Sequence, residues 1–184
     1  MPLKFIIKPQ LYNIKIHKDL LRSSVIGNEV ILKFSKTLIL NLFYIIKQHT
    51  LFQQTQLLDI IVVDVLGHKV VIYLFFSCKF NNLMRCITNI KDFHTTLASC
   101  ASLYKSASWS ECEIWDLFGL YFITNQNLHR ILTDYNFKGY ALQKLFPLTG
   151  FIDSFYNVST SLISYRPVEL SGNFRNFRTI NNWY

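Results

Sequence analysis

The chain has 184 residues, of which 51% are hydrophobic and 16% are charged, and its formal net charge is +8. This length fits one domain with a buried core, and the small share of charged residues indicates burial against partners. The longest unbroken apolar run, Val70–Phe76, is far below the roughly 18 to 20 residues that cross a bilayer, which excludes a membrane-spanning helix.

The positive charge favours nucleic acid, anionic lipid or an acidic protein as a partner, without choosing among them. No run of five like charges occurs, and the basic residues are scattered. We interpret the mild N-terminal cluster as a solvated face or the rim of a partner interface, with an RNA-contacting arm as the alternative. The chain start lacks the apolar stretch and the Arg- and Ser-rich composition of signal and transit peptides. The clustered residues are Lys4, Lys8, Lys15, Lys18 and Arg22.

After a mixed N-terminal segment, the sequence predicts a strand followed by a helix. Asn13–Ile26 has a mixed apolar pattern that is compatible with a short helix, and Val30–Phe34 predicts a strand. Apolar residues then recur at intervals of three to four, which predicts a helix that ends near His49 and covers a sheet. The apolar positions of that helix are Leu38, Leu42, Ile45 and Ile46.

The sheet follows directly. Leu57–Leu66 and Val70–Cys78 are β-branched and aromatic runs that flank Gly67-His68-Lys69, a pattern that predicts a hairpin. Neither run alternates cleanly, so we expect both strands to be buried on two faces. Asp59 and Asp64 interrupt the first run, and we interpret them as strand-end or partnered carboxylates, because no further acid or histidine completes a catalytic site.

Leu83–Ile90 predicts a third strand, and Thr95–Tyr104 a helix. The predicted fold is α+β, with one small mixed or antiparallel sheet covered by helices in residues 1–147 and a long extended C-terminal tail in residues 148–184. The tail carries glycine, proline, asparagine and serine between isolated aromatic residues, and cannot bury those aromatics within itself. It therefore wraps its own domain or lies in grooves of a partner.

Residues 110–147, here called the signature segment, concentrate acids, aromatics and glycines. Ser110 and Glu113 have the spacing of a capping box, and Gly119 is a helix stop, so we expect one capped helix over residues 111–118. The acids Glu111, Glu113 and Asp116 suit the positive end of that helix. Helix-end electrostatics explains them better than a catalytic or metal-binding trio.

No cofactor, metal or catalytic site is predicted. The four cysteines form no C-x-x-C pair and have no histidine at ligand spacing, which argues against zinc and iron–sulfur sites. A phosphate-binding glycine loop, a nucleophile elbow and an H-E-x-x-H motif are also absent from the sequence. The cysteines are Cys78, Cys86, Cys100 and Cys112.

The signature segment reads E-x-E-x-x-D-h-F-G, an aromatic pair, L-x-R-I-L-T-D-Y-x-F-x-G and K-x-F-P. This order resembles the signature of the NADH dehydrogenase subunit 9 family, the thirty-kilodalton subunit of respiratory complex I. A weaker resemblance to the family's E-P-h-E-L-x-x-x-F-R-x-F pattern begins at Pro167. The residues that the resemblance marks as family-signature or subunit-interface positions are Glu111, Glu113, Asp116, Gly119, Arg130, Asp134, Gly139, Lys144, Pro147, Pro167, Glu169, Phe174 and Arg175.

The resemblance implies a cofactor-free structural subunit in the matrix-side peripheral arm of mitochondrial NADH:ubiquinone oxidoreductase, an inner-membrane complex. Its implied partners hold the quinone site and the terminal iron–sulfur cluster, and it braces the quinone-reducing module. On this interpretation Trp115, Phe118 and Tyr121 are mostly core. Polar contacts across subunits are expected from Arg130, Asp134, Lys144, Glu169 and Arg175.

The chain departs from the family pattern where charged or special residues are replaced, so the contacts those residues make in relatives are not carried over. The departures are Cys112, Asn125, Gln126, Ala141, Gln143, Leu145 and Arg166. An organellar RNA-binding or ribosomal protein is the alternative, because the chain is basic and rich in aromatics, although it has no RNA-binding motif. A free-standing oxidoreductase would instead bind flavin, nicotinamide or iron.

Overall fold

The computed structural model describes residues 20–26, 29–49, 54–65, 68–79, 81–91, 96–170, 172 and 175. The chain divides into two compact units, Met1–Phe146 and Pro147–Tyr184. We describe each unit by itself.

The first unit is built on a five-stranded mixed sheet in the order β1-β2-β5-β4-β3. Strands β2 and β5 are parallel, and the other neighbours are antiparallel. The predicted α+β fold with a small mixed sheet is confirmed, whereas a helix within residues 20–26 is wrong, and residues 13–19 lie outside the described part. The strands are β1 (Leu20–Ile26), β2 (Glu29–Phe34), β3 (Gln56–Val65), β4 (His68–Ser77) and β5 (Asn82–Ile90).

One face of this sheet is buried, and we call it the inner face. Along β4, buried residues alternate with partly exposed ones at every position, as expected of a pleated strand with one covered face. Val71, Tyr73 and Phe75 point inward and are fully buried. The prediction that both faces of β3 and β4 are buried is therefore wrong within this unit, although β4 is apolar on both faces.

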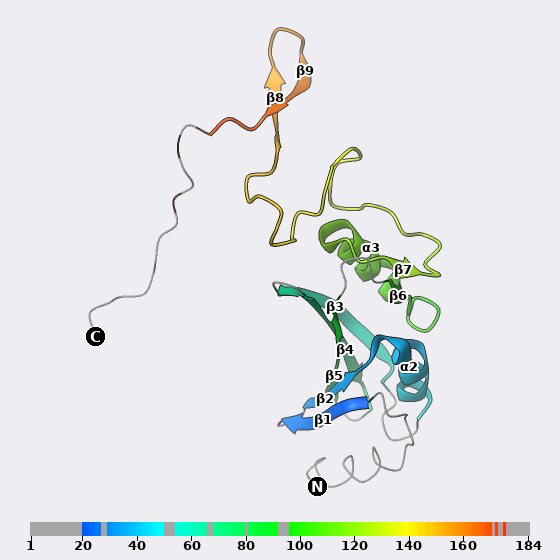
Figure 1. Ribbon diagram of the computed structural model, residues 1–184. Coiled ribbons are helices and arrows are strands. Elements are labelled where there is room, and N and C mark those ends of the chain that lie inside the picture. The colour runs from blue at the N-terminus through cyan, green and yellow to red at the C-terminus, as the bar shows by residue number, and fades with distance from the viewer. Residues whose placement is uncertain are drawn as a thin grey trace, which may run out of the picture. The chain divides into compact units, whose positions relative to one another are not determined.

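Helix α2 (Ile39–Gln48) covers the inner face, as predicted, and follows a short 3-10 turn, η1 (Lys36–Leu38) (Figure 1). The ring of Phe43 packs edge-on against Tyr73 and Phe75, each with ring centroids 4.8 Å apart. Such fully buried rings each contribute about 1.5–3 kcal/mol of transfer free energy. The buried residues that anchor α2 are Ile39, Leu42, Phe43 and Ile46.

After the sheet, Leu97–Ala98 (β6) pairs in parallel with Phe122–Ile123 (β7). The predicted helix over Thr95–Tyr104 is wrong: residues 97 and 98 are extended, and only one turn follows, in which the Leu103 and Tyr104 N–H groups donate to the Cys100 carbonyl. Leu97 is buried by its pairing with a segment 25 positions further along, which no local pattern reveals.

Helix α3 runs from Ala107 to Phe118, with Ser106 as its N-cap. Ser110 lies inside the helix, so the predicted capping box is wrong, because the helix begins one turn earlier, at the buried Ala107. The predicted stop is confirmed, since Gly119 takes a left-handed conformation with φ of 73°. Neither α2 nor α3, the α-helices of the described ranges, is long and apolar enough to cross a bilayer.

In the second unit, β8 (Ile152–Asn157) and β9 (Leu162–Pro167) form an antiparallel hairpin, so this part of the tail is paired as well as extended. Asp153 and Arg166 face each other across it, with Arg166 Nη2 3.1 Å from Asp153 Oδ2, and the guanidinium lies over the Phe155 ring. Most of its apolar side chains are exposed, among them Ile152, Tyr156, Val158, Leu162, Ile163 and Tyr165.

Candidate functional site

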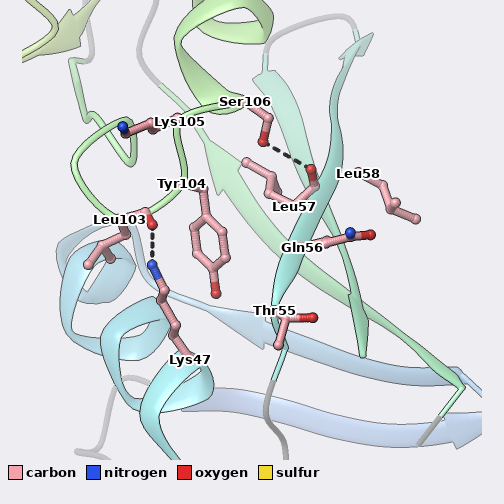
Figure 2. A pocket seen from close by; sticks show the side chains of 9 residues that line it. All are labelled: Lys47, Thr55, Gln56, Leu57, Leu58, Leu103, Tyr104, Lys105 and Ser106. Carbon is pink, nitrogen blue, oxygen red and sulfur yellow. Dashed lines mark hydrogen bonds between the residues drawn. The ribbon is translucent and has the colours of Figure 1, made fainter. Parts of the chain in front are cut away.

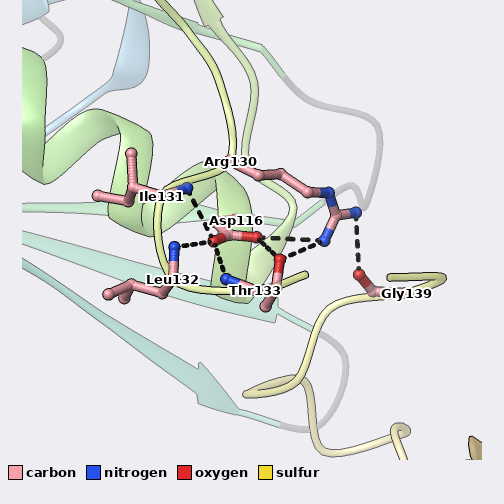
Figure 3. A network of polar contacts seen from close by, with 6 residues as sticks. All are labelled: Asp116, Arg130, Ile131, Leu132, Thr133 and Gly139. Carbon is pink, nitrogen blue, oxygen red and sulfur yellow. Dashed lines mark hydrogen bonds and ion pairs between the residues drawn. The ribbon is translucent and has the colours of Figure 1, made fainter. Parts of the chain in front are cut away.

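The site is the junction between α3 and the loop that follows it, and Asp116 lies at its centre (Figure 3). The Asp116 side chain is fully buried. Its Oδ2 atom accepts three consecutive backbone N–H groups, from Ile131 at 3.2 Å, Leu132 at 2.8 Å and Thr133 at 3.0 Å. Three N–H groups on one oxygen form a small anion-binding loop, and the aspartate on the helix supplies its anion.

The second oxygen of Asp116 meets Arg130. Arg130 Nη1 is 3.1 Å from Asp116 Oδ1, and the Thr133 hydroxyl also donates to Oδ1. The other end of the guanidinium donates from Nη2 to the Gly139 carbonyl at 3.1 Å. Arg130 thus links α3 to a part of the loop nine residues further along the chain. Its side chain is only 19% exposed, so this pair is partly shielded from solvent.

Three aromatic rings surround the Arg130 guanidinium. Its central carbon lies 5.6 Å from the ring centroid of Trp115, 5.9 Å from that of Phe137 and 5.4 Å from that of Tyr140. Contacts of this kind favour a cation and are typical of arginine over an aromatic face. Trp115, predicted as core, is thus partly buried beside a cation.

The surroundings of Asp116 favour its charged form. Burial alone would raise the pKa of this carboxyl, but the Thr133 hydroxyl and the N–H groups of Leu132, Thr133 and Ile131 outweigh burial and leave the pKa below its usual value of 3.8. Asp116 is therefore ionised at neutral pH and serves as a structural anchor. A general acid needs a raised pKa, whereas the pKa of Asp116 is lowered.

Glu111, one and a half turns earlier on α3, is a second buried anchor. Its carboxylate accepts hydrogen bonds from the Ser99 hydroxyl at 2.7 Å, the Cys100 N–H at 2.8 Å and the Asn125 amide at 2.9 Å. It therefore fixes the segment before α3 and the segment after it to one helix position. The prediction that Glu111 serves the helix N-terminus is wrong, because it lies inside the helix and points into the core.

The two signature glycines permit close aromatic approach. Gly119 has φ of 73° and Gly139 has φ of 111°, conformations that residues with a Cβ rarely adopt. A Cβ at Gly119 would lie 2.6 Å from Cε2 of Tyr140, and a Cβ at Gly139 would lie 2.8 Å from Cε2 of Phe146. Both positions therefore require glycine for backbone and for space.

The C-terminal carbonyl groups of α3 are satisfied by the loop and the sheet. The Leu142 N–H donates to the Leu117 carbonyl at 3.0 Å, and the Gln143 amide donates to the Phe118 carbonyl at 2.8 Å. Lys69 of β4 reaches the same Phe118 carbonyl at 2.6 Å and adds positive charge at the negative end of the helix. Burial lowers the pKa of Lys69, and the Asp64 carboxylate acts in the opposite direction.

Both strand aspartates have backbone partners. Asp64 Oδ2 accepts the Lys144 N–H at 2.9 Å, which connects the end of the signature segment to β3. Asp59 Oδ1 accepts the N–H of the next residue, Ile60, at 2.7 Å. Both are partnered carboxylates, as the sequence indicated.

Other predicted site residues are mostly at the surface of their own unit. In the first unit Glu113, Asp134 and Lys144 are exposed. In the second unit Pro167, Glu169 and Arg175 are exposed and Pro147 is partly exposed. Tyr121 is 51% exposed, so its prediction as core is wrong, whereas Phe118 packs against the core as expected. Phe174 lies outside the described residues. The contacts across subunits expected from Arg130, Asp134, Lys144, Glu169 and Arg175 stay predictions.

A separate pocket of about 410 Å³ opens between the end of α2, the start of β3 and the turn before α3 (Figure 2). The Lys47 ammonium donates to the Leu103 carbonyl and lies 5.0 Å from the centroid of the Tyr104 ring. The Ser106 hydroxyl donates to the Leu57 carbonyl at 3.1 Å, which attaches the start of α3 to β3. These contacts join α2, β3 and the turn before α3.

The described ranges hold no group of residues suited to a metal, and two of their cysteines are buried with raised pKa values. No group of three or more histidine, cysteine, aspartate and glutamate residues gathers there as a metal site would require. Burial raises the pKa of the Cys86 and Cys100 thiols well above their usual range, and in Cys100 the Glu111 carboxylate adds to the effect. The site therefore consists of structural anchors.

The fold and the site together define an α+β module in which one helix fixes a long irregular loop through two buried carboxylates. Residues 32–152 match the family model described as respiratory-chain NADH dehydrogenase, 30 Kd subunit. The chain belongs to this family, the 30 kDa subunit family of respiratory complex I, and the resemblance of the signature segment is confirmed.

Three similar relatives share the name NADH-ubiquinone oxidoreductase subunit 9. The chain is 35% identical over 153 residues to NADH-ubiquinone oxidoreductase subunit 9 of Dictyostelium discoideum, covering 79% of this chain and 73% of that protein. It is 34% identical over 158 residues to the Reclinomonas americana protein of the same name, covering 84% of this chain and 77% of the relative. The match to the Dictyostelium citrinum protein, 38% identical over 139 residues, covers 72% of this chain and 66% of the relative.

Two solved structures share the fold. One is a chain of the membrane-bound sulfane sulfur reductase, an archaeal respiratory membrane complex, with a TM-score of 0.61 and 19% identity over 72% of this chain and 78% of that one. The other is the trypsin-resistant fragment of Nqo5, with a TM-score of 0.53 and 16% identity over 70% of this chain and all of the fragment.

Proposed function

We propose that this chain is a structural subunit of the peripheral arm of NADH:ubiquinone oxidoreductase in mitochondria. It lies on the matrix side, carries no cofactor of its own and braces the quinone-reducing module against neighbouring subunits. Its family membership supports assembly into this enzyme. The name of its relatives, NADH-ubiquinone oxidoreductase subunit 9, supports the choice of this respiratory complex.

One observation carries the structural role. The two buried acids of α3, Glu111 and Asp116, are occupied by hydrogen bonds from the chain's own groups, and those of Asp116 hold its pKa low. Both carboxylates fix backbone geometry, and the lowered pKa of Asp116 keeps that residue from exchanging protons at neutral pH. The site thus gives a fixed shape to the loop after α3, which is what a bracing subunit requires.

The second unit supports hetero-oligomeric assembly. A two-stranded hairpin is at best marginally stable alone in water, and this one exposes Ile152, Tyr156, Ile163 and Tyr165 on the same face of β8 and β9. Exposed apolar and aromatic side chains of this kind are typical anchors of protein interfaces. In our proposal this unit lies against neighbouring subunits, among them those that hold the quinone site and the terminal iron–sulfur cluster.

The test is to recover the tagged full chain from mitochondria in mild detergent and to identify what accompanies it. We expect a large assembly that oxidises NADH and reduces ubiquinone, with the chain itself colourless once it is separated from the other subunits. Recovery with ribosomal RNA, or tight RNA binding that weakens steeply with salt, would instead support the RNA-binding class and contradict the proposal. A flavin or iron centre on the separated chain would contradict its cofactor-free role.

A further inference from the structure

The five-stranded sheet has a second face, opposite α2, that we call the outer face. Ile72 of β4 lies in register between Ile61 of β3 and Ile87 of β5, so three isoleucines form one row across the sheet. Val70 and Val63 form the neighbouring row. On the edge strand β3 these side chains are openly exposed, Ile61 by 39% and Val63 by 45%.

The described elements of the first unit leave this face uncovered. Helix α2 packs on the inner face through Phe43, and Figure 1 shows α2 on one side of the sheet, with none of the described helices of this unit on the other. A strand with one solvated face normally alternates apolar and polar residues, whereas β4 places Val70, Ile72 and Leu74 on the outer face. This sequence pattern is that of a sheet covered on both sides.

The charges at the border of the outer face indicate the chemistry of the cover. On the outer side of β2 and β5, Arg85 is paired with Glu29 at 2.9 Å and is 42% exposed, and the exposed Lys33 lies in register beside Ile87. A paired Arg85 and an exposed Lys33 at the border of an apolar patch fit a carboxylate on a protein partner. Arg22 of β1 is in register with Lys33, and these three described positions fall short of the four to eight basic residues that recruit anionic membranes.

We propose that the outer face is a docking surface for a different protein subunit, one that presents an apolar helix or sheet face with a carboxylate opposite Lys33. This inference rests on the proposed function, since it assigns one interface of the assembled enzyme. The partner supplies the second covering layer that the sheet lacks, and burying the isoleucine row provides the apolar centre of the interface.

The experiment uses tagged full-length variants in mitochondria, with recovery in the NADH-oxidising assembly as the readout. Ile61→Lys places a charge on the outer face at an edge strand, and Ile72→Thr keeps a β-branched residue at its centre. We expect each to lower recovery about tenfold. Tyr44→Lys is the control, because Tyr44 is 57% exposed on α2. Lys33→Glu tests whether the positive charge at the border of the outer face matters for recovery. Lys36→Glu, which makes the same charge change on η1, is its matched control.

The outcomes separate the two proposals. If the wild-type chain is absent from the assembly, the proposed function fails; if the wild type and both isoleucine variants are recovered equally, only the docking surface fails. Purified variants are expected to unfold within about 2 °C of the wild type, which shows that lost recovery is not lost folding. A purified wild-type chain that dimerises, and becomes monomeric on Ile61→Lys, would overturn the proposal in favour of a second copy.

Discussion

Replacing Asp116 by asparagine tests whether the buried carboxylate holds the loop. The variant keeps the shape of the side chain and one carbonyl oxygen, which can still accept the N–H groups of Ile131, Leu132 and Thr133. The new amide nitrogen then faces the Arg130 guanidinium, so a charge-assisted hydrogen bond is lost and a partly buried cation is left unpaired. Such a loss costs about 2–4 kcal/mol of the free energy of unfolding.

The assay is urea unfolding of the full chain, followed by circular dichroism and tryptophan fluorescence, with Asp134→Asn at an exposed position as the control. The pH dependence has a definite sign. Because the folded-state pKa of Asp116 is lowered from its usual 3.8, the stability it contributes is fully present above that value and is lost as pH falls through the folded value.

The difference between the wild type and Asp116→Asn should therefore be largest at neutral pH and shrink below about pH 4. Equal stability of the two proteins at pH 7, within about 0.5 kcal/mol, would refute the reasoning. A difference that stays constant from pH 7 to pH 3 would refute the electrostatic part alone.

Three further predictions concern single positions. Gly119→Ala is expected to cost about 1–3 kcal/mol in the same urea assay, because the residue has a positive φ and faces the Tyr140 ring, whereas Gly172→Ala meets no atom within 4 Å. Tyr73→Phe is expected to be neutral or slightly stabilising, because the buried Tyr73 hydroxyl has no hydrogen-bond partner among the described residues. In a thiol titration of the native chain, Cys78 should react at once, and the three buried thiols only after unfolding, namely Cys86, Cys100 and Cys112.

Each of these has a clear contrary result. Gly119→Ala as stable as Gly172→Ala would mean that the loop adapts to a Cβ. A loss of more than about 1 kcal/mol in Tyr73→Phe would show that its hydroxyl has a partner, such as a buried water. More than one fast thiol in the native chain would show that the core around α3 opens readily.

The sequence predicted the elements whose signals are local. The period of Leu38, Leu42 and Ile46 gave α2, the apolar runs gave β3, β4 and β5, and Gly119 gave the end of α3. These predictions succeed because helical periodicity, an apolar run and the conformation of a glycine each depend on only a few neighbouring residues. Two-faced burial was predicted wrongly for β3 and β4, because an apolar run shows that a strand is suited to burial but does not show whether a layer of the same unit covers each face.

The sequence could not predict the contacts that join distant segments. Glu111 was assigned to a helix start, but its partners, Ser99 and Asn125, lie 12 and 14 residues away and have no pattern of their own. Leu97 and Ala98 form a strand only because Phe122 and Ile123 lie beside them. Asp116 was expected near a helix start, whereas it lies in the last turn of α3, and its three N–H donors are backbone groups, which leave no trace in side-chain composition.

The three backbone hydrogen bonds to Asp116 determine which substitutions the loop after α3 can accept without moving. Asp116 binds the main-chain N–H groups of residues 131–133, so the positions of Ile131 and Leu132 are set without their side chains. Leu132 is 60% exposed, and its backbone N–H takes part in these hydrogen bonds while its side chain does not. Substitutions of the Leu132 side chain can therefore change the chemistry of this surface while the three backbone hydrogen bonds keep the loop in place.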